Sequence, residues 1–182
     1  GQALKNLDLI SARIGARSFA AIHPHLLTAL NRAGDPDMAL NNLERFLAEL
    51  DPVTQFIEDV RDRPALLGAL VVLFGASRFL AAWSVATAGE TYRFLRHSDF
   101  LAHPADKEHL ADRLAAVLRG VTREEDLFRV LRQYRKREML RIGLRGLLGK
   151  ADLTETVGEL SNLAEGCLQA AYERADAELR GR

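Results

Sequence analysis

Four arginines with helical spacing are the residues best suited to chemistry in this sequence. Arg137, Arg141 and Arg145 are four residues apart, so on a helix they form one cationic ridge. We include Arg135 in the same candidate docking ridge. Guanidinium groups bind carboxylates and phosphates through paired hydrogen bonds. The ridge therefore predicts a docking surface for an acidic partner, a phosphate-bearing ligand or an adjacent domain.

The same arginines have a purely structural alternative. Glu155, Glu159 and Glu165 follow them in the sequence and are expected on a neighbouring helix. Glu138 lies three residues before Arg141, a spacing that predicts a local ion pair. In this alternative the arginines join one helix to another and bind nothing outside the chain.

Two other patterns have the spacing of catalytic or metal-binding motifs. Asp35 and Asp37 bracket a proline, as in a two-metal carboxylate pair, but a helix follows them, which favours an N-cap. His23 and His25 also bracket a proline, and without a third ligand type nearby they favour a helix kink or a surface turn. No nucleophile elbow and no phosphate-binding glycine loop is present. We therefore predict no catalytic residue and no metal ligand in this chain.

The composition is that of a globular protein with a buried core. Hydrophobic residues make up 48% and charged residues 27% of the 182 residues, and the formal net charge is zero. Balanced charge argues against a dedicated nucleic-acid-binding or membrane-surface protein. Cys167 is the single cysteine, which excludes an intrachain disulfide and fits an apolar helix position in a reducing cytoplasm. No run reaches the roughly 18 apolar residues of a membrane span.

The elements that position these residues are predicted to be helices. Apolar residues recur with a period near 3.6, and neither hairpin turns nor sustained alternation indicates strands. Predicted N-caps are Asp35, Asp51, Thr122 and Asp152, and Gly149 is a predicted C-terminal cap. The predicted helices span 4–30 (with a possible bend at the histidine–proline step 23–24), 36–47, 53–60, 64–74, 78–85, 90–96, 105–119, 123–148 and 153–179.

The last two predicted helices are long and joined by a short connection. Such a connection favours antiparallel packing of the two helices. The most apolar run, residues 66–74, is expected to be a buried helix and not a strand. We therefore predict an all-α fold, a multi-helix bundle with two long antiparallel C-terminal helices, with residues 1–182 forming a single helical domain or fragment.

Four segments in order carry a resemblance to a known family. They are DMALNNLERFL at 37–47, LFGASRFL at 73–80, RKREMLRIGLR with the LLG and ADLT that follow it at 135–154, and LSNLAEGCL at 160–168. Over residues 35–180 they resemble the N-terminal helical region of the glutamine synthetase adenylyltransferase/adenylyl-removing enzymes. Two features depart from that family: Gly146 stands where an acidic residue is usual, and residues 82–96 differ from the usual pattern.

This resemblance implies a parent nucleotidyltransferase with two halves. One half removes AMP from a tyrosine of glutamine synthetase by phosphorolysis, and the other attaches AMP from ATP with Mg²⁺ under control of the PII signalling protein and glutamine. The Ser-Asp-x-Asp metal motif of the family's nucleotidyltransferase domain is absent from this sequence. The resemblance therefore implies a non-catalytic scaffold, docking or regulatory region of the adenylyl-removing half, located in the cytoplasm and without a cofactor of its own. Its expected partners are the nucleotidyltransferase domain, glutamine synthetase and PII, and neither nucleic acid nor membrane.

The alternative function is a stand-alone helical interaction module. In that case the basic ridge itself binds an acidic protein or a nucleic acid. Binding to generic nucleic acid that weakens steeply with salt would be its signature. The balanced net charge disfavours this class.

Overall fold

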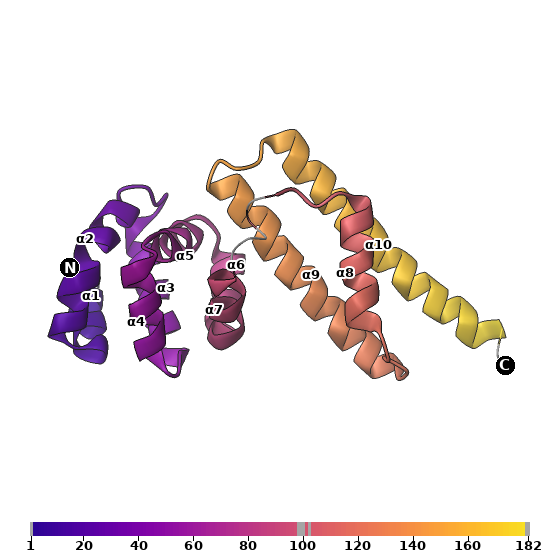
Figure 1. Ribbon diagram of the computed structural model, residues 1–182, viewed down its shortest axis with the longest axis horizontal. Coiled ribbons are helices and arrows are strands. Elements are labelled where there is room, and N and C mark those ends of the chain that lie inside the picture. Colours follow the sequence, from indigo (N-terminus) through magenta and orange to yellow (C-terminus); the bar gives the residue numbers. More distant parts are fainter. Residues whose placement is uncertain (1, 98–100, 102, 181–182) are drawn as a thin grey trace. The chain divides into compact units, whose positions relative to one another are not determined.

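The computed structural model describes residues 2–97, 101 and 103–180 (Figure 1). These residues form ten α-helices and no strand, which confirms the predicted all-α fold. The helices are α1 (Gln2–Ile14), α2 (Ala16–Leu30), α3 (Pro36–Glu49), α4 (Val53–Asp62), α5 (Ala65–Ala76), α6 (Arg78–Ala86), α7 (Ala88–Arg96), α8 (Lys107–Leu118), α9 (Glu124–Leu147) and α10 (Leu153–Arg180). The chain divides into two compact units, Gly1–Ser98 (unit 1) and Asp99–Arg182 (unit 2), at a boundary that the sequence did not indicate.

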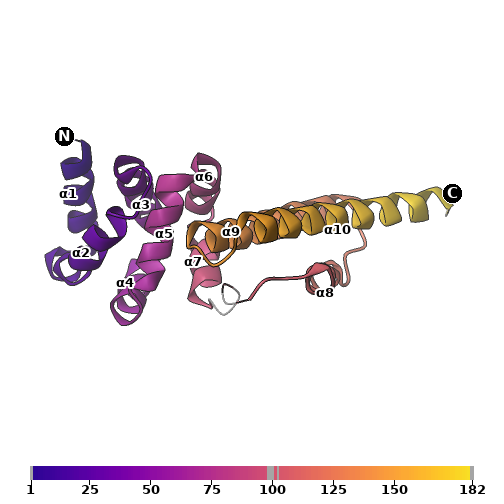
Figure 2. The ribbon, with the colours of Figure 1, turned by 90° about the horizontal axis from the view of Figure 1, so that it is seen from above.

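Unit 1 is built around α5. Nine of the twelve residues of this helix are buried, as expected for a helix that is apolar on every side. It contacts α2, α3, α4 and α6, and Figure 2 shows it among its neighbours. The ring of Phe74 lies 5.6 Å from that of Phe46, which in turn lies 6.0 Å from that of Phe56. The buried helix predicted at 66–74 is therefore confirmed.

The predicted helix over 4–30 is two helices, and the break lies at Gly15. This residue has a φ of 84°, which glycine adopts without the steric cost of a side chain. Pro24, where a bend was expected, lies inside α2. The buried side chains of Ile22 and Leu26 flank it and hold this part of α2 against the core. The bend expected at this proline stays a prediction, because a helix that continues through a proline can still be kinked.

Three of the predicted caps are confirmed. The Met38 N–H donates to Asp35 Oδ1 at 2.9 Å, and the Glu155 N–H donates to Asp152 Oδ1 at 2.8 Å. Gly149 follows α9 with a φ of 68°, the left-handed conformation of a helix C-terminal cap. These caps depend on local hydrogen bonds, which explains why short patterns were enough to find them.

Two predicted caps were wrong. Helix α4 begins after Pro52 and not after Asp51, and no side chain bonds to its first N–H groups. Helix α9 begins after Arg123, one residue beyond the predicted Thr122, again without a side-chain cap. In both cases the predicted residue is of a type that often caps helices, but the helix begins one residue later.

Unit 2 consists of α8, α9 and α10. Helices α9 and α10 run in opposite directions side by side, and α8 contacts both (Figure 1). Their shared core includes Leu110, Leu131, Tyr134, Ile142 and Leu163. Within the described residues, no helix combines the length and the hydropathy needed to cross a bilayer.

Candidate functional site

The four arginines of the candidate docking ridge lie in two different environments. Arg141 and Arg145 are buried, with relative exposures of 0% and 2%. Arg135 and Arg137 are exposed on the same helix. The structure therefore divides the ridge into a buried pair and an exposed pair. Residue spacing predicted on which side of the helix each arginine lies. It did not predict that α10 covers only part of that side.

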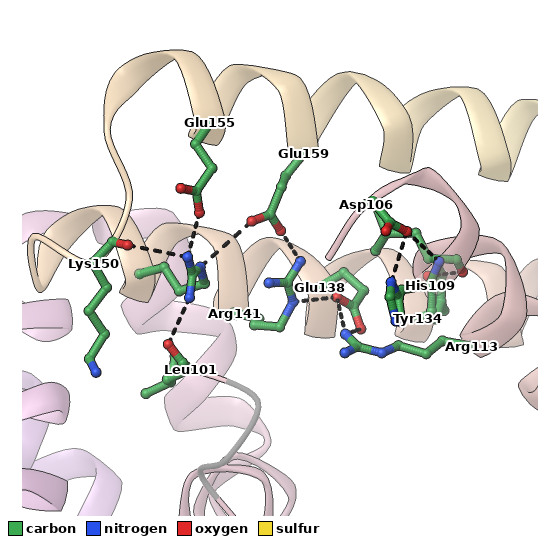
Figure 3. Close-up of polar contacts among 12 residues, drawn as sticks. Leu101, Asp106, His109, Arg113, Tyr134, Glu138, Arg141, Lys150, Glu155 and Glu159 are labelled. Atoms are coloured by element: carbon green, nitrogen blue, oxygen red, sulfur yellow. Dashed lines mark hydrogen bonds and ion pairs between the residues drawn. The ribbon is translucent and has the colours of Figure 1, made fainter. Parts of the chain in front are cut away.

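Arg141 and its partner Glu138 together join three helices of unit 2. Its Nε donates to Glu138 Oε2 at 2.7 Å on the same helix, which confirms the predicted local ion pair. Its Nη2 donates to Glu159 Oε2 on α10 (Figure 3). Glu138 also lies 3.4 Å from Nη1 of Arg113, which comes from α8. The structural alternative thus correctly named Glu159, whereas Arg113 carried no signal in the sequence.

Arg145 makes a second set of contacts one turn along α9. Its Nη1 donates to the Leu101 carbonyl at 2.8 Å, and its Nη2 donates to the Lys150 carbonyl at 3.2 Å and to Glu155 (Figure 3). Its Nε lies 3.6 Å from Glu159 Oε1. Backbone carbonyls have no sequence signature, so these two acceptors could not be predicted from residue types.

The charges of this cluster balance within the chain. Its cations are Arg113, Arg141 and Arg145, and its anions are Glu138, Glu155 and Glu159. Burial alone would lower the pKa of Arg141, but the hydrogen bonds from its guanidinium to Glu159 and then Glu138 raise that pKa above its ordinary value. A buried ion is tolerated when it is paired and hydrogen-bonded. The cluster therefore has the properties of internal scaffold.

The ion pairs also define how α9 and α10 are aligned. Arg141 pairs with Glu159, and Arg145, four residues later, pairs with Glu155, four residues earlier. Moving forward along α9 thus means moving backward along α10, as in an antiparallel pair. A slip of one turn would leave a buried charge without its partner, which is strongly unfavourable. We interpret the cluster as the device that fixes the register of the two helices.

The other predicted motifs do not gather into a metal site. Asp35 caps α3, as expected, and Asp37 lies in the first turn of that helix. His23 and His25 both lie on α2. Among the described residues, no three His, Cys, Asp or Glu side chains lie close enough together to hold a metal ion. The described residues therefore do not fit the Mg²⁺ that the resemblance implies for the parent enzyme.

Cys167 is a half-buried residue beside the core of unit 2. It packs against the buried cluster formed by α8, α9 and α10. Burial raises the pKa of its thiol, and the charge of Arg135 opposes this only in part. A raised thiol pKa means less thiolate at neutral pH, so this environment is that of an inert packing residue.

Helix α10 has an apolar face that the described residues of unit 2 leave exposed. Leu153, Leu168 and Leu179 are 78%, 71% and 72% exposed. With the other exposed apolar residues they recur every three or four positions, which places them on one side of the helix. We call this side the α10 outer face; it consists of Leu153, Val157, Leu160, Ala164, Leu168, Tyr172, Ala175 and Leu179. An adjacent side of the helix contributes Leu163 to the core of unit 2.

A groove of about 430 Å³ lies between α8 and α10. Leu114, Gly166 and Ala170 contribute to its lining. Lys107 also lines it and pairs with Glu165 at 2.6 Å, across the two helices. None of the groove-lining residues belongs to the α10 outer face, so the groove is a separate surface of unit 2.

The four family-like segments, 37–47, 73–80, 135–154 and 160–168, contribute to contacts between helices. In unit 1, Nδ2 of Asn42 donates to the Phe74 carbonyl at 3.2 Å, which joins the first segment to the second. In unit 2, the third segment carries Arg141 and Arg145, and its partner acid Glu159 directly precedes the fourth. These residues hold helices together, so the contacts of the four segments support a structural role for them.

Comparison with known proteins agrees with the resemblance. The family model described as glutamate-ammonia ligase adenylyltransferase matches residues 67–181. The chain is 37% identical over 103 residues to the bifunctional glutamine synthetase adenylyltransferase/adenylyl-removing enzyme of Thioalkalivibrio sulfidiphilus, covering 57% of this chain and 10% of the relative. With the enzymes of the same name from Nitrosococcus oceani and Mesorhizobium japonicum it is 36% and 30% identical, covering 72% and 87% of this chain and 13% and 16% of those relatives.

The match is therefore to one part of much longer proteins. The chain spans between 10% and 16% of the length of these three relatives. No solved structure gives a significant match. Since the family model covers well over half of the residues, the chain belongs to the glutamate-ammonia ligase adenylyltransferase family.

Proposed function

We propose that this chain is a non-catalytic helical region of an enzyme that adds AMP to, and removes it from, a tyrosine of glutamine synthetase. The relatives carry both activities in their names, and the chain corresponds to a small part of each of them. The polar cluster of unit 2 is balanced internally, and the described residues offer no set of metal ligands. Both observations favour a scaffold or docking role.

The α10 outer face is the observation that carries this proposal. A helix whose apolar surface is wider than the side that packs on its own core is typical of a protein interior. Leu168 and Tyr172, 71% and 66% exposed, lie on the side of α10 away from the core of unit 2. Burying a leucine fully stabilises a protein by about 1.5–3 kcal/mol. A face with several such residues therefore favours a permanent contact, and we assign that contact to the remainder of the same enzyme.

The remaining functions of the parent enzyme belong to parts outside this chain. In this proposal the nucleotidyltransferase domain holds ATP and Mg²⁺, and the helical region positions that domain, glutamine synthetase or the PII protein. Arg135 and Arg137 are the members of the docking ridge whose exposure suits a protein partner. Arg141 and Arg145 contribute to docking indirectly. Their ion pairs hold α10 against α9 and so fix the position of the α10 outer face within unit 2.

Replacing Leu168 by aspartate in the complete enzyme tests the proposal. A carboxylate buried without a partner is strongly unfavourable. We expect the rate of AMP removal from adenylylated glutamine synthetase to fall at least about tenfold, as a few kcal/mol of lost packing implies. The chain alone should keep its helix content with the same change, because Leu168 is exposed there. The unchanged chain should release no AMP by itself.

Gln169→Asp is the matched control. This residue is the exposed neighbour of Leu168 but lies outside the α10 outer face. The control should leave the rate of AMP removal unchanged and should cost the complete enzyme no more than about 1 kcal/mol, because it removes the hydrogen bond from Gln169 to Glu173 and adds a like charge four residues from Glu173. Equal rates and equal stabilities for the two variants would show that the face is not an internal contact. AMP release by the chain alone would refute its non-catalytic role.

A further inference from the structure

A separate group of arginines surrounds a pocket in unit 1. The pocket has a volume of about 310 Å³ and lies between the α1–α2 junction and one side of α4. Arg13 reaches it from the end of α1, Arg17 from the start of α2, and Arg61 from α4. Three helices thus each contribute one guanidinium group to the same concave surface.

These arginines have no carboxylate at ion-pairing distance in the part of the chain that the structure describes. Among the described residues, Arg13, Arg17 and Arg61 make no ion pair. Glu58 is the one acidic residue in the pocket lining, and the contact recorded for its carboxylate is with Gln55, whose Nε2 lies 3.4 Å away. Three cations and one anion leave the lining with two positive charges. This contrasts with the cluster of unit 2, where every buried arginine has its acid.

Local structure brings these groups together. The positive φ of Gly15 turns the chain between α1 and α2, so that residues on both sides of it face the same pocket. On α4, Thr54, Glu58 and Arg61 are four and three residues apart and share one side of the helix. The hydroxyl groups of Thr54 and Ser18, which also line the pocket, add hydrogen-bond donors to the guanidinium groups.

We propose that this pocket binds the phosphate group of a small phosphorylated molecule. Arginine forks match the oxygens of phosphates in geometry as well as in charge. A phosphate monoester carries about two negative charges at neutral pH, which equals the excess charge of the lining, whereas a single carboxylate carries one. The volume is at the lower end of the range for small-molecule sites and leaves room for a small organic group beside the phosphate.

Calorimetric titration of the chain with ribose 5-phosphate tests this site. We expect saturable binding, with ribose as the uncharged control giving none. Arg17→Gln and Arg61→Gln should each weaken binding about tenfold, since each removes charge-assisted hydrogen bonds. Both side chains are exposed, so the variants should fold normally, as checked by circular dichroism. Arg45→Gln, an exposed arginine of α3 that is absent from the pocket lining, is the matched control and should bind as tightly as the unchanged chain.

Two further measurements distinguish binding at the proposed site from non-specific electrostatic attraction between the protein and an anion. Binding should strengthen from pH 5 to pH 7.5, because the second ionisation of a phosphate ester lies near pH 6 and no histidine lines the pocket. Inorganic phosphate, titrated separately, shows whether the phosphate group alone is sufficient or the ester is required. Absence of saturable binding to both phosphates, or an equal loss in the Arg45 and Arg61 variants, would overturn the proposal. The test does not depend on the role proposed for the α10 outer face.

Discussion

Replacing Arg141 by methionine should lower the free energy of unfolding of unit 2 by about 3–5 kcal/mol. The reason is that Glu138 and Glu159 would stay buried while losing the guanidinium group that both of them contact. Hydrogen exchange at the amides of α9 and α10 measures this quantity, because it reports the stability of each part of a protein separately. The loss should appear in both helices, since the ion pair joins them.

Two comparisons identify the cause of that loss. Arg135→Met changes the same residue type on the same helix at an exposed position, and should alter stability by no more than about 0.5 kcal/mol. Combining Arg141→Met with Glu138→Gln and Glu159→Gln should recover part of the stability, because the two carboxylates that keep only their more distant partners, Arg113 and Arg145, are then neutral. If Arg141→Met costs no more than Arg135→Met, the buried cluster does not hold α9 against α10.

The second large effect is expected at Gly75, near the end of α5. A Cβ atom at this position would lie 2.9 Å from the Asp35 carbonyl oxygen and 2.9 Å from the Ala33 Cβ. A backbone carbonyl cannot move aside as a flexible side chain can. Gly75→Ala should therefore destabilise unit 1 by about 3 kcal/mol, at the upper end of the usual cost of overpacking. Chemical denaturation followed by circular dichroism measures this loss.

Gly68 provides the matched control on the same helix. A Cβ atom there would meet nothing within 4 Å. Because alanine favours a helix over glycine, Gly68→Ala should stabilise unit 1 by about 0.5–1 kcal/mol. The two identical substitutions are thus expected to have opposite signs. Destabilisation of the same size in both variants would mean that the close approach of α5 to the start of α3 is not what requires glycine at position 75.

The sequence predicted features that depend on neighbouring residues. The helices, the caps at Asp35 and Asp152, and the end of α9 at Gly149 follow from local spacing and hydrogen bonding. The ion pair between Glu138 and Arg141 was also local, because three residues separate them on one helix. The family resemblance gave longer-range information, since its segments contain residues, such as Asn42 and Arg141, that join one helix to another.

Features that depend on packing were missed. Arg137 and Arg141 share a helix side by spacing, but only Arg141 is covered by α10, and no pattern in α9 records that difference. The break at Gly15 was missed, because a single glycine inside a helical pattern is a weak local signal. The arginine pocket of unit 1 was missed because Arg61 is far in sequence from Arg13, and only the fold brings them together.

Oxidative footprinting of side chains tests the central claim most directly, namely that the α10 outer face is buried against the rest of the enzyme. Hydroxyl radicals oxidise exposed leucine, phenylalanine and tyrosine side chains, and mass spectrometry locates the products. Leu168 and Tyr172 should be oxidised readily in the chain alone and at least about tenfold more slowly in the complete enzyme. Phe79 of unit 1, which is 55% exposed, serves as the reference for normal access to solvent. Equal oxidation of Leu168 and Tyr172 in the chain and in the complete enzyme would contradict the proposed contact.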